Sequence, residues 1–111
     1  MSVSVKLSLT RLRRVIKGER AALDRASKAY AEAVSDLAQQ LAPVDTGELR
    51  ASIHVEAGDV QGSHKVVASV PYAVFVEFGT HTAAAQPFLT PAWRHTNPLP
   101  FFARELAELI K

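Results

Sequence analysis

Residues 11–43 read RLRRVIKGERAALDRASKAYAEAVSDLAQQLAP, and their apolar positions recur at intervals of three and four residues. This spacing places them on one face of an α-helix, with Glu19 as the interruption. Thr10 is a suitable N-cap, and Pro43 ends the pattern because proline forces the preceding residue out of helical geometry. The sequence therefore predicts a long helix over residues 11–41, with this apolar face: Leu12, Ile16, Leu23, Ala26, Tyr30, Ala33, Val34, Leu37 and Leu41.

A helix of this length needs something to cover it. At about 1.5 Å per residue it extends on the order of 45 Å, whereas a compact chain of this size has a radius of gyration of about 13 Å. Its far end is therefore expected either to pack on a neighbouring subunit or to bend at Gly18. A coiled-coil seam is the competing interpretation, but the second heptad position would then hold residues that are weak for a zipper, namely Glu19, Ala26, Ala33 and Gln40.

Three segments show the alternation of polar and apolar residues that is typical of half-buried strands. Residues 1–9 alternate valine or leucine with serine or lysine. Residues 52–57 and 64–70 alternate on either side of a Gly-Asp-Val-Gln-Gly turn at 58–62, which predicts an antiparallel hairpin. The strand in residues 1–9 is expected to extend this sheet.

The segment between the long helix and the hairpin carries a capping-box pattern. Asp45 precedes Glu48 by three residues, so each side chain can accept a hydrogen bond from the backbone amide of the other. Gly47 keeps this segment sterically open. We therefore expect a short turn over residues 45–50.

Residues 72–78 form an apolar run with a single charge, Glu77, and are compatible with either a strand or a short helix. Pro71 before the run and Gly79 after it favour a short helix over 72–78. Glu77 is then expected to be exposed. The side chains expected to face the core are Tyr72, Phe75 and Val76.

Two C-terminal helices are predicted over residues 88–95 and 98–110, the second opened by Asn97 and Pro98. Its apolar face holds Leu99, Phe102, Leu106, Leu109 and Ile110. The fold class is α+β: a long N-terminal helix packed on a small antiparallel sheet, with a short helix and a C-terminal helix. A chain of 111 residues supports one hydrophobic core, so we expect a single domain over residues 1–111.

The composition limits the class of protein. The chain has no cysteine, which removes disulfides and cysteine-based zinc sites. No apolar run approaches the roughly 20 residues needed to span a bilayer, and the alternating N-terminus does not resemble a signal peptide. We expect a protein that does not contact a membrane, is made in the cytoplasm, and is stabilised by packing or by partner subunits.

The net charge of +2 is unevenly distributed. Residues 1–28 hold eight Lys/Arg against two acidic residues, a net +6, and the remainder of the chain is net −4. This arrangement fits either nucleic-acid contact or head-to-tail stacking of subunits with opposite charges. Residues 6–28 contain no aromatic residue for base stacking, which favours subunit stacking.

No pattern of catalytic or metal-binding residues emerges. The histidines lack a metal-binding spacing, although His54 and His64 lie on opposite arms of the predicted hairpin and could meet. Neither a nucleophile elbow nor a nucleotide-binding glycine pattern occurs, and Thr46 and Ser52 are interpreted as capping groups. We predict no catalytic residue, no metal and no cofactor.

The roles of Glu77 and Trp93 each have two possible interpretations. Glu77 has apolar neighbours, so it is either an acid with a raised pKa or, as we favour, a carboxylate paired with an arginine such as Arg50 at a subunit contact. Trp93 is interpreted as an anchor in the core or in an interface.

Three segments in order carry a family resemblance: APVDTGELRASI at residues 42–53, YAVFVEFGT at 72–80 and QPFLTPA at 86–92. With the preceding strand and long helix, they resemble the HK-ninety-seven-type gene-product-ten family over nearly the whole chain. The loop after Thr80 is shorter here than in many relatives, where it is glycine-rich and basic. A DNA-lining role for this loop is therefore not expected.

The resemblance implies a structural virion protein of a tailed phage or prophage, without enzymatic activity, that forms a ring at the head-tail junction. The implied partners are further copies in a hexamer or dodecamer, head-completion or adaptor proteins, the tail terminator and DNA passing the ring. The implied location is the neck or tail of the virion. The positions expected to shape the fold and the subunit contacts are Asp45, Thr46, Gly47, Leu49, Arg50, Tyr72, Glu77, Phe78, Gly79, Pro87, Phe88 and Pro91.

Two other functions are compatible with parts of the sequence. A small basic nucleic-acid-binding module would use residues 6–28, and its affinity for duplex DNA would fall steeply with salt. A small hydrolase of the tail would need a catalytic site that the sequence does not display.

Overall fold

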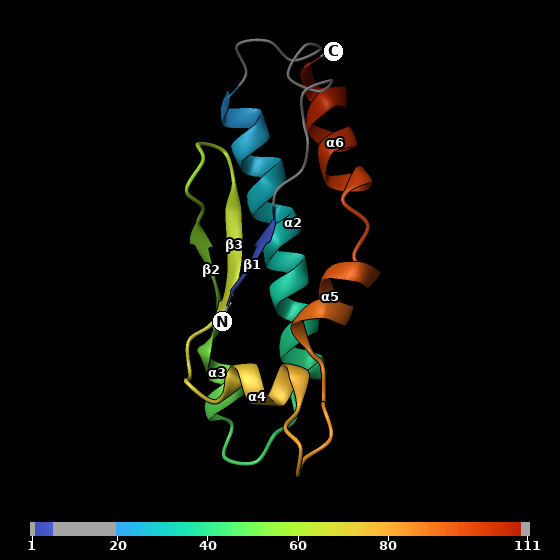
Figure 1. The fold of residues 1–111 in the computed structure, drawn as a ribbon. Helices are drawn as coiled ribbons and strands as arrows, with labels where there is room; N and C mark the ends of the chain where they lie inside the picture. The colour runs from blue at the N-terminus through green and yellow to red at the C-terminus, as the bar shows by residue number, and fades with distance from the viewer. Residues whose placement is uncertain (1, 6–19, 110–111) are drawn as a thin grey trace.

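The computed structural model describes residues 2–5 and 20–109, and their arrangement is α+β, as the sequence predicted (Figure 1). The elements are β1 (Ser2–Val5), α2 (Arg20–Leu41), α3 (Glu48–Ser52), β2 (Ile53–Ala57), β3 (His64–Ala68), α4 (Ala73–Phe78), α5 (Leu89–His95) and α6 (Leu99–Leu109). The principal dimensions of the molecule are 53 × 22 × 21 Å, so it is elongated.

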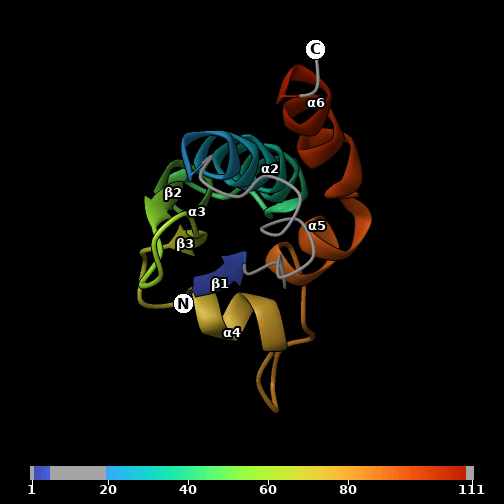
Figure 2. The same cartoon turned by 90° about the horizontal axis from the view of Figure 1, so that it is seen from above.

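The sheet has three antiparallel strands in the order β1-β3-β2. Val66 at the centre of β3 lies opposite Val3 on one side and Val55 on the other. The predicted hairpin and its extension by the N-terminal strand are therefore confirmed. The predicted strand over residues 1–9 is observed for Ser2–Val5, and its other residues lie outside the described part of the chain. Figure 2 shows α2 packed on one face of the sheet, with α5 and α6 to the right of α2 in this view.

Helix α2 buries a stripe of mostly small residues, including Ala31, Val34 and Ala38, and ends one residue before the buried Ala42. The predicted helical residues 11–19, with Gly18, lie outside the described part of the chain. From Arg20 onward, α6 packs beside the N-terminal half of α2. The chain itself therefore covers this part of the helix, and the far end, which was predicted to pack on a neighbouring subunit or to bend at Gly18, lies outside the described residues.

Specific contacts fix α6 against α2. Arg25 Nη2 forms an ion pair with Glu105 Oε2 at 3.0 Å, and the rings of Tyr30 and Phe101 meet edge to face at 5.8 Å between centroids. Phe102 is buried as predicted, but Leu99 is 69% exposed. The prediction that Leu99 faces the core is wrong, because α6 turns its opposite side, with Phe101, toward Tyr30.

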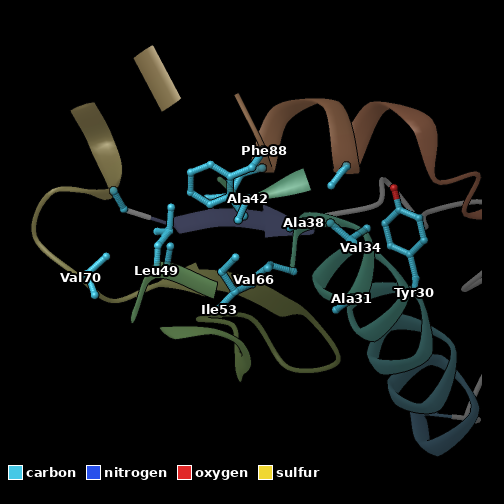
Figure 3. Close-up of a cluster of buried hydrophobic side chains, with 14 residues drawn as sticks. Tyr30, Ala31, Val34, Ala38, Ala42, Leu49, Ile53, Val66, Val70 and Phe88 are labelled. Carbon is cyan, nitrogen blue, oxygen red and sulfur yellow. The ribbon is translucent and has the colours of Figure 1, made fainter. Parts of the chain in front are cut away.

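The core lies between α2, the sheet and α5 (Figure 3). Phe88 and Leu89 at the start of α5 are completely buried, as are Val34 of α2 and Val66 of β3. Full burial of a large apolar side chain contributes about 1.5–3 kcal/mol. The segment around Phe88 therefore holds α5 onto the rest of the molecule.

Candidate functional site

The segment between α2 and α3 is the first part of the candidate site along the chain. Gly47 has φ +85°, a left-handed conformation that suits glycine, and its carbonyl accepts a hydrogen bond from Ala51 N at 3.0 Å. Thr46 Oγ1 accepts from Glu48 N at 3.3 Å, and Gly47 at the N-cap position has no side chain to cap α3. The predicted capping box of Asp45 and Glu48 is therefore wrong, because α3 begins only after Gly47 and the hydroxyl of Thr46 takes the amide instead.

Helix α4 buries the residue that was predicted to be exposed and exposes two of the residues that were predicted to be buried. Glu77 is buried, with 2% of its surface exposed, whereas Tyr72 and Phe75 are exposed and Phe78 is 69% exposed. Of the three residues expected to face the core, Val76 alone packs against it. The helix predicted over 72–78 is thus confirmed at Ala73–Phe78, but its interior face is built around a carboxylate.

Glu77 is buried because it holds the start of α5. Its Oε2 accepts hydrogen bonds from Phe88 N at 2.7 Å and Leu89 N at 3.1 Å, and its Oε1 accepts from Thr90 N at 2.8 Å. The first amides of a helix have no hydrogen-bond partner within the helix. They lie at the positive end of the helix dipole, which favours an anion. Glu77 satisfies three of these amides from eleven to thirteen residues away.

The expected pairing of Glu77 with Arg50 is wrong. Arg50 Nε donates instead to the carbonyl of Gln39 in α2 at 2.9 Å, and Glu77 is saturated by backbone amides. Burial raises the pKa of Glu77, but the hydrogen bonds from Thr90, Phe88 and Leu89 outweigh it, so the pKa lies below its ordinary value. The interpretation of Glu77 as an acid with a raised pKa is therefore also wrong.

The loop after α4 folds back on the helix. Gln86 N donates to Val76 O at 2.8 Å, and Thr80 N donates to Ala83 O at 2.9 Å. Gly79 has φ +77°, and a Cβ there would lie 2.7 Å from Ala85 N, closer than real Cβ atoms come to backbone. Only glycine fits at this position, which explains why the loop follows a glycine.

These elements enclose a surface hollow of about 520 Å³, which we call the motif groove. It is lined by residues 43–49, by Tyr72, Phe75 and Val76, and by residues of the 80–86 loop. Asp45 and Glu48 are its charged residues, and the lining contains no Lys, Arg or His. The groove is therefore apolar with an acidic border, and it lies at the end of the molecule that holds α3 and α4 (Figure 1).

Exposed apolar side chains continue around the groove: Val44 (56%), Tyr72, Val74, Phe75 (58%) and Phe78. Desolvation and the Glu48 carboxylate raise the pKa of Tyr72, whose hydroxyl donates to Glu48 Oε2 at 3.5 Å. Scattered exposed apolar residues are normal, but an aromatic group of this kind on one short helix is a candidate interaction surface.

The structure brings the three predicted motifs together. Leu49 and Phe88 lie in the core, with Leu49 at the base of the motif groove. Pro87 is exposed next to Phe88, and Pro91 is half-buried in the first turn of α5. The motif residues thus divide into those that build the groove and those that fasten α5 beneath it. Sequence reasoning missed the exposure of Phe75 and Val44, because apolar periodicity was taken to point inward.

The histidines do not form a shared site. His54 lies opposite Val67 and His64 opposite Ala57, so the two side chains extend from opposite faces of the sheet. Hydrogen bonds to the Ser52 carbonyl and to Glu56 raise the pKa of His54. The described residues contain no group of three or more His, Cys, Asp or Glu that could hold a metal ion.

His64 takes part in a buried polar contact between the sheet and α2. Its Nδ1 lies 2.9 Å from Ser27 Oγ and its Nε2 lies 3.5 Å from Asp24 Oδ1. Ser27 is 3% exposed in the middle of a helix, so no substrate carbonyl can reach its hydroxyl. We interpret these residues as a packing contact and not as a nucleophilic triad.

The described part of the basic segment is not a uniformly basic surface. Residues 6–19 lie outside the described part. Within residues 20–28, Asp24 is exposed beside Lys28 and near His64, and Arg25 is paired with Glu105 of α6. No helix of the described residues is long and apolar enough to cross a membrane.

The fold and the groove define a small α+β protein that presents an apolar, acid-bordered groove at one end. Comparison with protein families gives a match over residues 7–79, about two thirds of the chain, to the model described as "Bacteriophage HK97-gp10, putative tail-component". The chain belongs to this HK97-gp10-like family of phage structural proteins. Comparisons with curated proteins and with solved structures gave no match.

Proposed function

We propose that this chain is a structural subunit of a tailed-phage or prophage virion and forms an oligomeric ring at the head-tail junction. Membership of a phage tail-component family supports the virion role. The observation that carries the assembly role is the exposure of Phe75 and Phe78 beside the motif groove. Removing such surface from water contributes about 25 cal/mol per Å², so a contact here stabilises an assembly of subunits.

The proposed assembly uses different surfaces on the two sides of each subunit. Such head-to-tail contacts generate closed rings when the rotation between neighbours closes. The proposed ring has a head-completion or adaptor protein on one side and the tail terminator on the other. DNA passes through the centre during packaging and ejection.

We further propose that the subunit has no catalytic role. Two features support this. The Glu77 carboxylate is fully engaged by three backbone amides, and its pKa is lowered. The Ser27 hydroxyl, next to His64, is buried within α2.

Size-exclusion chromatography with light scattering tests the assembly role. The purified protein is measured alone and mixed with the adaptor and tail-terminator proteins of the same phage. We expect a ring-sized mass, either alone or after mixing. Phe75→Asp should abolish it, whereas Val60→Asp, a matched change at an exposed valine on the β2–β3 turn, should not.

The opposite result identifies the competing function. A protein that stays monomeric with both partners but binds duplex DNA, with an affinity that falls steeply with salt, is a nucleic-acid-binding module. That outcome would overturn the proposed ring.

A further inference from the structure

The corner between α5 and α6 is a second exposed surface with large apolar side chains. Trp93 is 43% exposed and Leu99 is 69% exposed. Arg94 and His95 are exposed in the last turn of α5. Arg94 makes no hydrogen bond or ion pair with any residue that the structure describes. We call the exposed residues of this corner, Trp93, Arg94, His95 and Leu99, the basic corner.

The basic corner is held in one shape by hydrogen bonds. The Tyr30 hydroxyl of α2 donates to Thr96 O at 3.1 Å, and Thr96 Oγ1 donates to Ala92 O at 2.7 Å. Leu99 N donates to Asn97 Oδ1 at 3.0 Å, which starts α6. A surface fixed in this way loses little conformational entropy on binding, which suits a contact that must repeat identically.

The motif groove and the basic corner are complementary. The groove is apolar with Asp45 and Glu48 at its border and no basic residue in its lining. The corner carries two exposed apolar side chains, Trp93 and Leu99, and the exposed cation of Arg94. A hollow of about 520 Å³ lies within the range of pockets that bury a drug-sized group, so it has room for an indole or an isobutyl side chain.

The same charges disfavour the symmetric alternatives. A groove-to-groove contact would bring the Asp45 and Glu48 carboxylates of two copies together. A corner-to-corner contact would bring the two Arg94 side chains together. Like charges placed against each other oppose binding and suppress the wrong pairing.

We propose that the motif groove binds the basic corner of a second copy of this chain, with Trp93 or Leu99 inserted beside Phe75 and Arg94 opposite Asp45. This inference rests on the proposed ring and identifies which surfaces meet in it. One subunit then contributes its groove and the next its corner. The contact is heterologous, as ring closure requires.

Disulfide trapping tests the contact directly, because the natural chain has no cysteine. Phe75→Cys and Leu99→Cys, both at exposed positions, are made separately, one chain carrying a mass tag, then mixed and oxidised. Val60→Cys, exposed on the β2–β3 turn, replaces either partner as the matched control. Disulfides need Cα atoms about 4.4–6.8 Å apart, so only residues that meet are trapped efficiently.

We expect the mixed dimer of the Phe75→Cys and Leu99→Cys chains to form about tenfold more than either control mixture, given this geometric requirement. Equal yields in all mixtures, or a preference for Phe75→Cys homodimers, would overturn the inference. A charge exchange gives a second readout. Asp45→Arg and Arg94→Glu should each weaken self-association about five- to tenfold, and the doubly exchanged chain should recover it.

The two proposals fail in different ways. If the wild-type protein assembles to ring size while the mixed disulfide does not form, the proposed contact is wrong and the ring forms through another surface. If the mixed disulfide forms and the charge exchange restores association, but the protein never reaches ring size with its virion partners, the contact stands and the ring is wrong. Circular dichroism of each variant confirms that it is folded.

Discussion

Replacing Glu77 with alanine should destabilise the protein far more than the loss of an ordinary glutamate. The change removes the acceptor for three backbone amides at the start of α5. The amides of Phe88 and Leu89 lie in buried surroundings and would have no access to water, whereas that of Thr90 is partly exposed and can be hydrated.

The magnitude follows from these amides. A buried donor left without a partner costs about 1–3 kcal/mol, so two of them give about 2–6 kcal/mol for Glu77→Ala. Glu77→Gln keeps one acceptor oxygen but removes the charge, and each remaining bond weakens by about 1 kcal/mol, so the expected loss is about 1–3 kcal/mol. The total stability of a domain this size is about 5–15 kcal/mol, so the alanine variant should lose a large share of it.

Urea denaturation followed by far-UV circular dichroism measures these differences as free energies of unfolding. Glu32→Ala, at an exposed position in α2, is the matched control and should change the free energy by no more than about 0.5 kcal/mol. The reasoning is refuted if Glu77→Ala is within about 1 kcal/mol of wild type, since an unsatisfied buried amide pair cannot cost so little.

Three further outcomes are expected. The pKa of Glu77 lies below its ordinary value of 4.5, so the contribution of the ionised carboxylate to folding stability is complete above pH 4.5 and is lost as pH falls through the folded-state pKa. The free energy of unfolding should therefore fall less steeply with acid for Glu77→Gln than for wild type. Gly79→Ala should lower stability by about 2–3 kcal/mol in thermal unfolding, because the new Cβ would lie 2.7 Å from Ala85 N. Gly62→Ala is the control: its φ is also positive, at +84°, but the space around it is open, so the loss should be only about 1 kcal/mol. Phe88→Ala should cost about 3–5 kcal/mol in urea and the exposed Phe78→Ala no more than about 0.5 kcal/mol; equal losses would contradict the assigned burial.

The arrangement of helices and strands was largely predictable because it depends on local patterns. The three-and-four spacing up to Leu41 gave α2, and alternation about the 58–62 turn gave the hairpin. Pro71 and Gly79 correctly favoured a helix over a strand for α4. These signals act through backbone conformation within a few residues, and the sequence displays them directly.

The candidate site was less predictable because it depends on contacts between distant segments and on surface exposure. The bonds from Glu77 to α5 join residues more than ten positions apart, and no spacing rule marks them. The periodicity rule also assumes that apolar residues face inward, and the outward Phe75 violates it. A signal was present: a lone carboxylate among aromatic residues, followed by a helix start without its own capping side chain.

The buried carboxylate and the exposed aromatic surface are two consequences of one helix rotation. Successive residues of an α-helix are about 100° apart, so when Glu77 faces α5, Phe75 points about 160° away from it, toward solvent. The charge that fastens α5 thus also presents Phe75 at the motif groove. Glu77→Gln should therefore weaken both stability and self-association, whereas Phe75→Ser should weaken self-association alone. A Glu77→Gln protein that is destabilised yet associates like wild type would show that the aromatic surface does not depend on this anchor.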